Sequence, residues 1–443
     1  MIERWNRDQV LALAPDAPSR KAAQGVSSPG RWSGAGVTSE AVWGECAGSG
    51  SKPYRACVDL SEPAYRCSCP SRKFPCKHAL GLLLLWSADG VPAAEEPADW
   101  AAEWLEQRRA RAAGPAPAPA RAAEPGSVPD LRRAEQREQR VTAGLSELER
   151  WLADQVRQGI AGSRRHDHWD DLVKRLIDAQ APGVAGAVSR LGSVLAHEDW
   201  PARLLGEYAL LHLLAVAHRR LPATTAAGDG PGAALAQTVR ERIGFPVAKE
   251  DVLAGRTVRD VWDVLGRRDS EQDRLIARRV WLRGRTTGRA ALVLSYAPVG
   301  QALDASLITG TTLDADLAFY PGSAPLRALV ATRHDAPAGT AGTPGPVPGS
   351  PVERVLAEVA EALAGDPWLD SWPVVLDAVT PAKSGSWLLA GPTGGLPLHP
   401  SAGTPWRLLA VSGGRPLTVA AEWTPDGLLP LTTWDEEGRV IVL

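Results

Sequence analysis

The sequence predicts an α+β protein in which a small N-terminal ββα unit precedes a helical block and α+β or β-rich C-terminal modules. Three observations support this: short alternating runs near the N-terminus, apolar residues at helical spacing in the middle, and strand-length apolar runs from residue 278 onward. The chain has 443 residues, of which 44% are hydrophobic, so it can form several domains with buried cores.

Two segments rich in proline, alanine and glycine divide the chain. Residues 111–129 and 335–351 contain few core-forming side chains, which is typical of extended linkers. We therefore predict an N-terminal module over 1–110, a helical block passing into an α+β region over 130–334, and a C-terminal α+β module over 352–443. Because such linkers are solvated, we expect the first linker to uncouple the N-terminal module from the rest.

The N-terminal module contains short, partly alternating runs bounded by Gly, Ser and Pro. These runs, at 41–46, 54–60 and 64–69, predict a small antiparallel meander. The apolar run at 77–86 predicts the helix that completes the ββα unit. On a further predicted helix, the pair Trp100 and Trp104 either anchors a partner or packs back onto this module.

Apolar residues recur at helical spacing through the first half of the central block, which predicts a helical bundle. They include Val141, Leu145, Leu148, Trp151, Leu152 and Val156, and the pattern continues over 172–179, 184–195 and 203–219. In the C-terminal module we expect one helix at 352–363. Strands are predicted at 372–379, 386–390, 406–412, 417–423 and 439–443.

Four residues of metal-ligand type lie within a twelve-residue window. Cys67, Cys69, Cys76 and His78 have the spacing C-x-C-x6-C-x-H. Residues two apart in a strand project to the same face, so the first two thiolates can bind one ion, and a proline-bracketed turn can return the chain to it. Three thiolates and one imidazole complete a tetrahedral shell, which predicts one structural Zn²⁺. The alternative is two buried thiols beside an unrelated Cys and His.

The C-x-C…C-x-H pattern, followed by an apolar helix that starts at the histidine, resembles the SWIM zinc finger over about residues 40–90. Together, the runs WGECAGSGSKPYRACVDL and CSCPSRKFPCKHALGLLLLW resemble the bacterial SWIM zinc finger family proteins. This resemblance implies a ββα zinc finger that binds DNA or a protein partner. It also implies an association with a MoxR-type AAA+ ATPase system.

Charge gives further indications about the partner. The net charge of −2 argues against a protein that coats nucleic acid. Residues 50–86, however, carry six basic and two acidic side chains, and with the Cys3His zinc centre at −1 the local charge is about +3. The side chains we expect to contact nucleic acid or another partner are Arg66, Arg72, Lys73, Phe74 and Lys77. If the partner is DNA, the basic side chains would provide most of the contacts, whereas a protein partner would depend on the apolar Phe74. The acidic charge of the rest of the chain would repel a duplex and therefore slightly favours a protein partner.

No catalytic residue is predicted. Gly44–Gly48 has the G-x-C-x-G shape of a nucleophile elbow, but a Gly- and Pro-containing turn follows where a helix is required. His166 and His168 form either part of a hydrolytic metal centre or the start of a helix capped by Asp170 or Asp171. An enzyme with an unidentified active site in 130–443, and the finger as an accessory, is the alternative to a binding protein.

The sequence contains no apolar run long enough to cross a membrane and no apolar segment at its start typical of a secretory signal. Its five cysteines are mostly clustered in the metal motif, which favours a reducing compartment over a disulfide framework. We therefore expect a cytoplasmic protein without a membrane partner.

Overall fold

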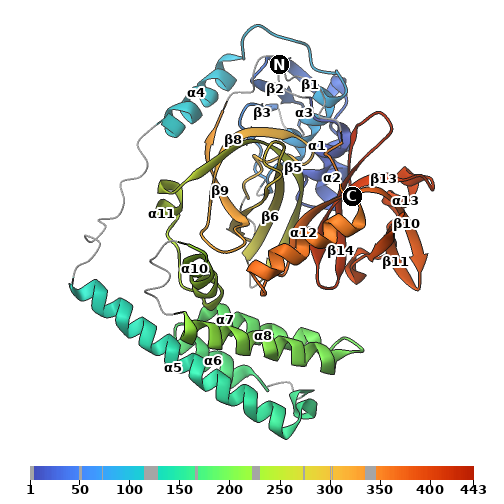
Figure 1. The fold of residues 1–443 in the computed structure, drawn as a ribbon. Helices are drawn as coiled ribbons and strands as arrows, with labels where there is room; N and C mark the ends of the chain where they lie inside the picture. The colour runs from blue at the N-terminus through green and yellow to red at the C-terminus, as the bar shows by residue number, and fades with distance from the viewer. Residues whose placement is uncertain are drawn as a thin grey trace.

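The computed structural model describes residues 4–48, 52–71, 73–113, 128–164, 168–221, 230–272, 275–299, 301, 303–334 and 346–443. An N-terminal sheet with its helices, a closed barrel and a C-terminal sheet lie together in the upper part of Figure 1, and a helical bundle forms the lower part. The α+β class and the order of its parts are as the sequence predicts. Within the described residues, every helix is too short or too polar to cross a membrane.

The N-terminal sheet is an antiparallel meander in chain order, with the strands β1 (Trp32–Val37), β2 (Ala41–Cys46), β3 (Tyr54–Asp59) and β4 (Ala64–Cys67). The predicted three-stranded meander is present, and β1 extends it by one strand. Two short helices, α1 (Arg7–Ala12) and α2 (Ala17–Gln24), precede the sheet, and a 3-10 turn, η1 (Pro29–Arg31), leads into β1.

The helix α3 (Lys77–Ser87) is apolar on all sides, and every residue from His78 to Trp86 is buried. A helix of this kind must be covered on opposite faces. The sheet covers one face of α3, while α1 and α2 pack against another. The local spacing predicts the helix, whereas its complete burial depends on residues that come before the finger motif.

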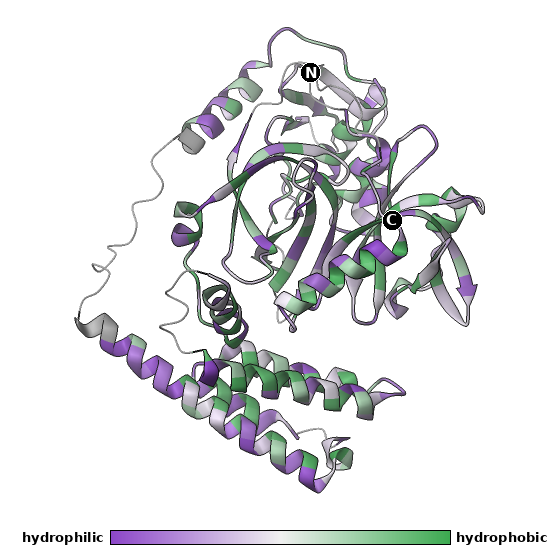
Figure 2. Ribbon diagram, viewed as in Figure 1, coloured by the Kyte–Doolittle hydropathy of each residue, from purple (hydrophilic) through white to green (hydrophobic). Residues whose placement is uncertain are grey.

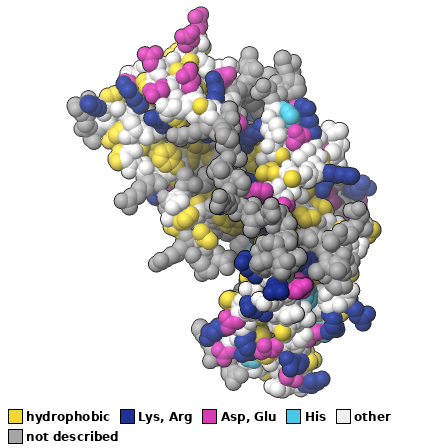
Figure 3. Space-filling view, turned by 90° about the vertical axis from the view of Figure 1, so that its left-hand side faces the viewer, with side chains coloured by type: hydrophobic (Ala, Val, Ile, Leu, Met, Phe, Trp, Pro, Cys, Tyr) yellow, Lys and Arg dark blue, Asp and Glu magenta, His cyan; other side chains and the backbone are white. Residues whose placement is uncertain are grey.

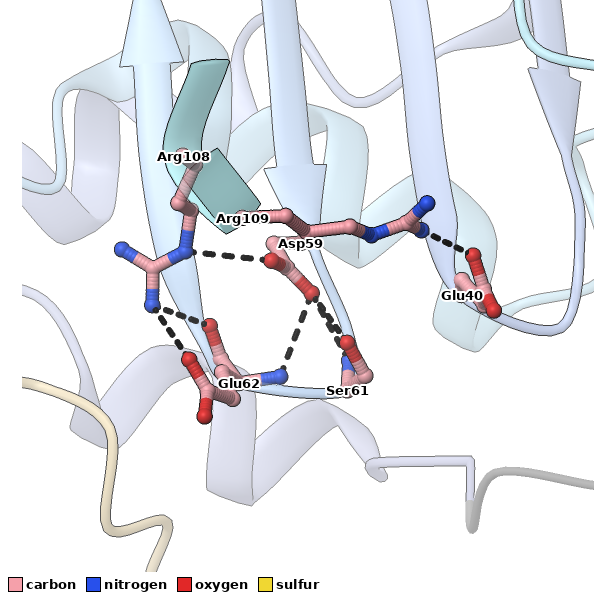
Figure 4. A network of polar contacts seen from close by, with 6 residues as sticks. All are labelled: Glu40, Asp59, Ser61, Glu62, Arg108 and Arg109. Atoms are coloured by element: carbon pink, nitrogen blue, oxygen red, sulfur yellow. Dashed lines mark hydrogen bonds and ion pairs between the residues drawn. The ribbon is translucent and has the colours of Figure 1, made fainter. Parts of the chain in front are cut away.

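The helix α4 (Asp99–Ala113) lies against the sheet. Trp100 and Trp104 contact the apolar cluster that contains Trp43 and Cys57. Of the two predicted alternatives, the structure therefore shows the one in which this pair packs back onto the N-terminal module. Figure 4 shows how the end of α4 is attached: Arg108 donates to Asp59 at the end of β3 and to Glu62 in the β3–β4 turn, and Arg109 pairs with Glu40.

The helical bundle consists mainly of α5 (Val128–Gln158), α6 (Asp170–Asp178), α7 (Pro182–Val194), α8 (Trp200–Arg220) and α10 (Pro231–Ile243). A 3-10 turn, η2 (Ile160–Arg164), precedes α6, and α11 (Lys249–Ala254) follows the bundle. The bundle core contains the residues predicted from helical spacing, including Val141, Leu145, Leu148 and Leu152. In Figure 2, hydrophilic residues predominate in the part of α5 that precedes this apolar stripe. Basic and acidic side chains are interspersed over the bundle in Figure 3.

The barrel closes in the order β5-β6-β7-β9-β8. Its strands are β5 (Thr257–Gln272), β6 (Leu275–Gly284), β7 (Ala290–Pro298), β8 (Thr312–Phe319) and β9 (Arg327–Arg333). Neighbouring strands are antiparallel except β7 and β9, and the interior is filled by Trp262, Leu282, Leu317 and other apolar side chains. The strand-length apolar runs noted from residue 278 onward are strands in the structure. The barrel nevertheless begins earlier, at β5, whose charged residues obscure its alternation.

The C-terminal sheet has the order β12-β11-β10-β13-β14-β15. Its strands are β10 (Trp372–Ser384), β11 (Ser386–Gly391), β12 (Gly394–Pro397), β13 (Leu417–Thr424), β14 (Gly427–Trp434) and β15 (Val440–Val442). The predicted helix is α12 (Val352–Gly365), and a 3-10 turn, η3 (Pro400–Ala402), follows β12.

The strand predicted at 406–412 is wrong, because this segment is the helix α13 (Trp406–Ser412). In a strand Trp406 and Leu408 would share a face. Here Trp406 is 75% exposed, while Leu408 and Ser412, four residues apart, are buried. The short run fits both periodicities, and its packing selects the helix.

The parts share buried contacts. One apolar cluster joins Leu265 and Trp281 of the barrel to Val375 and Leu431 of the C-terminal sheet. At the N-terminus, the amide of the buried Gln9 donates to the carbonyl of Thr309 at 2.9 Å. Ile308, from the same barrel segment, lies in the apolar core of the N-terminal module. The domain boundaries stay predictions, but the N-terminal module contacts the barrel directly.

Candidate metal centre

The four predicted ligands come together from separate elements. Cys67 ends β4, Cys69 follows it, Cys76 is the residue before the first turn of α3, and His78 lies within that turn. Their ligand atoms all lie within 4.8 Å of one another. Cys76 and His78 are buried, and the other two are half-buried. The predicted cluster is therefore present in the fold.

Local hydrogen bonds explain how the first two cysteines are held. The main-chain N–H of Ser68 donates to the carbonyl of Arg55 at 3.0 Å, and the Ser68 hydroxyl accepts from the Arg55 N–H at 2.9 Å. Ser68 thereby continues the pairing of β4 with β3 past Cys67, and it lies between the two ligands. The Tyr54 ring stacks on the His78 ring with centroids 4.7 Å apart, which limits the orientation of the imidazole.

The donor set fits a structural zinc ion. The hydrogen bond between the Cys67 and Cys76 thiols lowers the pKa of Cys76 and raises that of Cys67, because without a cation only part of this cluster can ionise. A Zn²⁺ ion stabilises all three thiolates at once. Three sulfur ligands and one nitrogen fill a tetrahedral shell, so the centre is closed and holds one structural Zn²⁺.

Among the described residues, no second group of potential ligands is found. Cys57 is buried in β3, and burial raises the pKa of its thiol to about 12. His168 lies 2.8 Å from the Gln155 side-chain oxygen, and His166 is outside the described residues. α6 begins at Asp170, but no side chain caps it, so the predicted cap is absent while the two acidic residues do lie in its first turn.

The predicted partner contacts do not all lie on one surface. Lys73 and Lys77 line a groove beside the metal centre, whereas Phe74 is half-buried in a second cavity against the barrel. Arg66 is exposed on β4, and Arg72 is outside the described residues. The Lys73 ammonium lies 2.5 Å from a carboxylate oxygen of Asp16, and this hydrogen bond lowers the pKa of Asp16 to about 2.

The groove has a volume of about 780 Å³ and reaches His78 and Cys69. Arg31 contributes a third basic side chain to it, and Val26, Ala22 and Tyr54 contribute apolar surface. The sequence prediction missed Arg31. It precedes the first ligand by more than 30 residues, and no local motif relates it to the metal site.

The family model described as SWIM zinc finger matches residues 57–86, and the model described as SWIM-associated four-helix bundle domain matches residues 136–243. No curated protein and no solved structure matches the chain. The first match agrees with the resemblance stated from the sequence. The second assigns a domain to the bundle, which helical spacing predicted without identifying.

Proposed function

From a SWIM zinc finger joined to a SWIM-associated four-helix bundle, we propose that this chain is a non-enzymatic binding protein whose finger docks an acidic segment of a partner protein. The observation that supports this most is the groove beside the metal centre, which carries Arg31, Lys73 and Lys77. A metal shell with four protein ligands has no position for a catalytic water, so the zinc serves to hold the groove in shape.

The composition of the groove favours a protein segment over a DNA duplex. Its three cations share the groove with apolar surface from Val26 and Tyr54, and Lys73 already has a carboxylate partner. Duplex binding at physiological salt requires many phosphate contacts, and each contact weakens as salt rises. An acidic peptide needs only a few charge pairs together with apolar contacts.

Nucleic acid is the second candidate. Neither Arg31 nor Lys77 has an ion-pair partner among the described residues, so both cations are available to phosphates. By family resemblance, a MoxR-type AAA+ ATPase system is a candidate source of the protein partner. We also propose the cytoplasm as its location.

Affinity capture of the native partner by the full chain tests this proposal. We expect the partner to be retained after nuclease treatment and lost with the double variant Arg31→Gln, Lys77→Gln. Lys21→Gln is the matched control, because Lys21 lies on α2 of the same module but does not line the groove. Capture that disappears with nuclease would favour nucleic acid, and capture unaffected by the double variant would exclude the groove.

A further inference from the structure

A second cavity, of about 400 Å³, lies between the finger, α4 and the barrel. Its lining includes Glu62 and Tyr65 from the finger, Arg108 from α4, and Asp304 and Arg333 from the barrel. None of the zinc ligands lines it. The segment that carries the ligands separates the two hollows, since Lys73 lines the basic groove and Phe74 lines this cavity.

The Arg333 guanidinium at the end of β9 lacks an anionic partner. It donates to the Ser306 hydroxyl at 2.6 Å, but no carboxylate within the described ranges lies within 4.0 Å of it. Burial lowers the pKa of Arg333, although Asp304 and Glu62 oppose this effect from a greater distance. A shielded guanidinium with free N–H groups is suited to bind a planar carboxylate through two hydrogen bonds.

Tyr65 lines the cavity, and its hydroxyl is a second unmet donor. It is buried and has no hydrogen-bond partner among the residues that the structure describes. Burial raises the pKa of Tyr65, and the Arg267 and Arg278 guanidiniums oppose this rise. Arg278 is already paired with Asp269, but one nitrogen of Arg267 is buried without a partner. Burial outweighs the two guanidiniums, so the hydroxyl stays protonated and remains a hydrogen-bond donor.

The remaining lining restricts what kind of anion fits. Arg108 is neutralised by Asp59 and Glu62, as Figure 4 shows, so it is not available to a ligand. Glu62 and Asp304 also line the cavity and would repel a polyanion such as a phosphate chain. Phe74, with its neighbouring proline, adds apolar surface. A ligand with one carboxylate, a hydrogen-bond donor and an apolar group matches these features.

We propose that this cavity binds the carboxylate of an amino-acid derivative or of a peptide C-terminus, with Arg333 and Tyr65 as its donors. The carboxylate pairs with the Arg333 guanidinium and supplies the acceptor that the Tyr65 hydroxyl lacks. An amide N–H of the same ligand faces Asp304, and its side chain lies against Phe74. This site is separate from the groove of the proposed function, so either proposal can fail without the other.

Titration calorimetry with N-acetyl-phenylalanine and its uncharged amide tests the site on the full chain. We expect the acid to bind about tenfold more tightly than the amide, because charged hydrogen bonds are about twice as strong as neutral ones. Arg333→Gln should remove this difference, and Tyr65→Phe should weaken acid binding several-fold, roughly the loss of one hydrogen bond. Arg109→Gln is the control, since Arg109 is on α4 beside Arg108 but outside the cavity.

Zinc content and thermal unfolding establish that each variant is folded, and Arg333→Lys provides a second variant that keeps the charge but loses the paired geometry. We expect Arg333→Lys to retain only part of the preference for the acid. A hexapeptide ending in a free Phe carboxylate distinguishes the sources: binding as tight as that of the small acid indicates a chain terminus, and much weaker binding indicates a free compound. Equal binding of acid and amide, or acid binding that Arg333→Gln leaves unchanged, would overturn the proposal.

Discussion

Ile308 provides a test of whether the finger and the barrel fold as one unit. This barrel residue is 2% exposed and lies in the same apolar cluster as Leu80 and Leu83 of α3. Ile308→Ala removes three buried carbon atoms, worth about 0.8 kcal/mol each, and leaves a cavity that adds a further penalty. We expect a loss of about 2.5–4 kcal/mol in the free energy of unfolding of the joint core.

Hydrogen exchange of the zinc-loaded protein measures this loss locally. If α3 can open only together with the joint core, amide exchange in α3 should accelerate about 50-fold to 1,000-fold, at about 1.36 kcal/mol per factor of ten. Val299→Ala is the control, because Val299 directly follows the barrel strand β7 but is 50% exposed. We expect that variant to change α3 exchange by a factor of about two or less.

One result would refute this reasoning: unchanged exchange in α3 while exchange in the barrel rises. The finger would then be stable without Ile308, and the linker after α4 would separate two independent folding units. The same measurement with a zinc chelator is complementary. We expect chelation to raise exchange in the finger and also near Thr309, which accepts a hydrogen bond from the N-terminal module.

Three further predictions concern the metal, pH and a buried charge. Metal analysis of the purified protein should find one zinc per chain. Cys67→Ser should lower the zinc content, and Cys57→Ser should not. Two zincs per chain would show that a second site had been missed. Burial lowers the pKa of His218, so its neutral form is favoured in the folded state. In urea unfolding, the free energy of unfolding should reach its full value above the unfolded pKa of about 6.5 and decrease as the pH falls below it. His218→Asn should reduce this decrease. Glu422 is 1% exposed and pairs with two arginines. Glu422→Gln should lower the free energy of unfolding in urea by about 3–5 kcal/mol, whereas Glu437→Gln, at an exposed position, should lower it by less than about 0.5 kcal/mol. Equal effects of the two substitutions would contradict the argument.

The sequence alone was sufficient for the metal site and for many of the elements. Cys67, Cys69, Cys76 and His78 lie within twelve residues, so strand alternation and one turn determine their proximity. The bundle helices were equally predictable, because apolar residues such as Leu145 and Leu148 recur at the helical period over a long stretch.

Short or heavily charged segments were less predictable. The run at 406–412 fits both a strand and a helix, and only the burial of Leu408 and Ser412 distinguishes the two. The barrel strand β5 carries many charged residues, which obscure its alternation, although Trp262 and Val264 point into the interior. In such segments, long-range packing decides the conformation.

Only the tertiary structure decided which distant residues share a surface. Arg31 joins Lys77 in the groove, and Arg333 meets Tyr65 in the cavity, although more than 260 residues separate the latter pair. Periodicity and spacing report which way a side chain faces within its own element, but not which other element will cover that face. The positions of these side chains depend on closure of the barrel and on Ile308 entering the core of the N-terminal module, and both result from burying apolar surface that is distant in the chain.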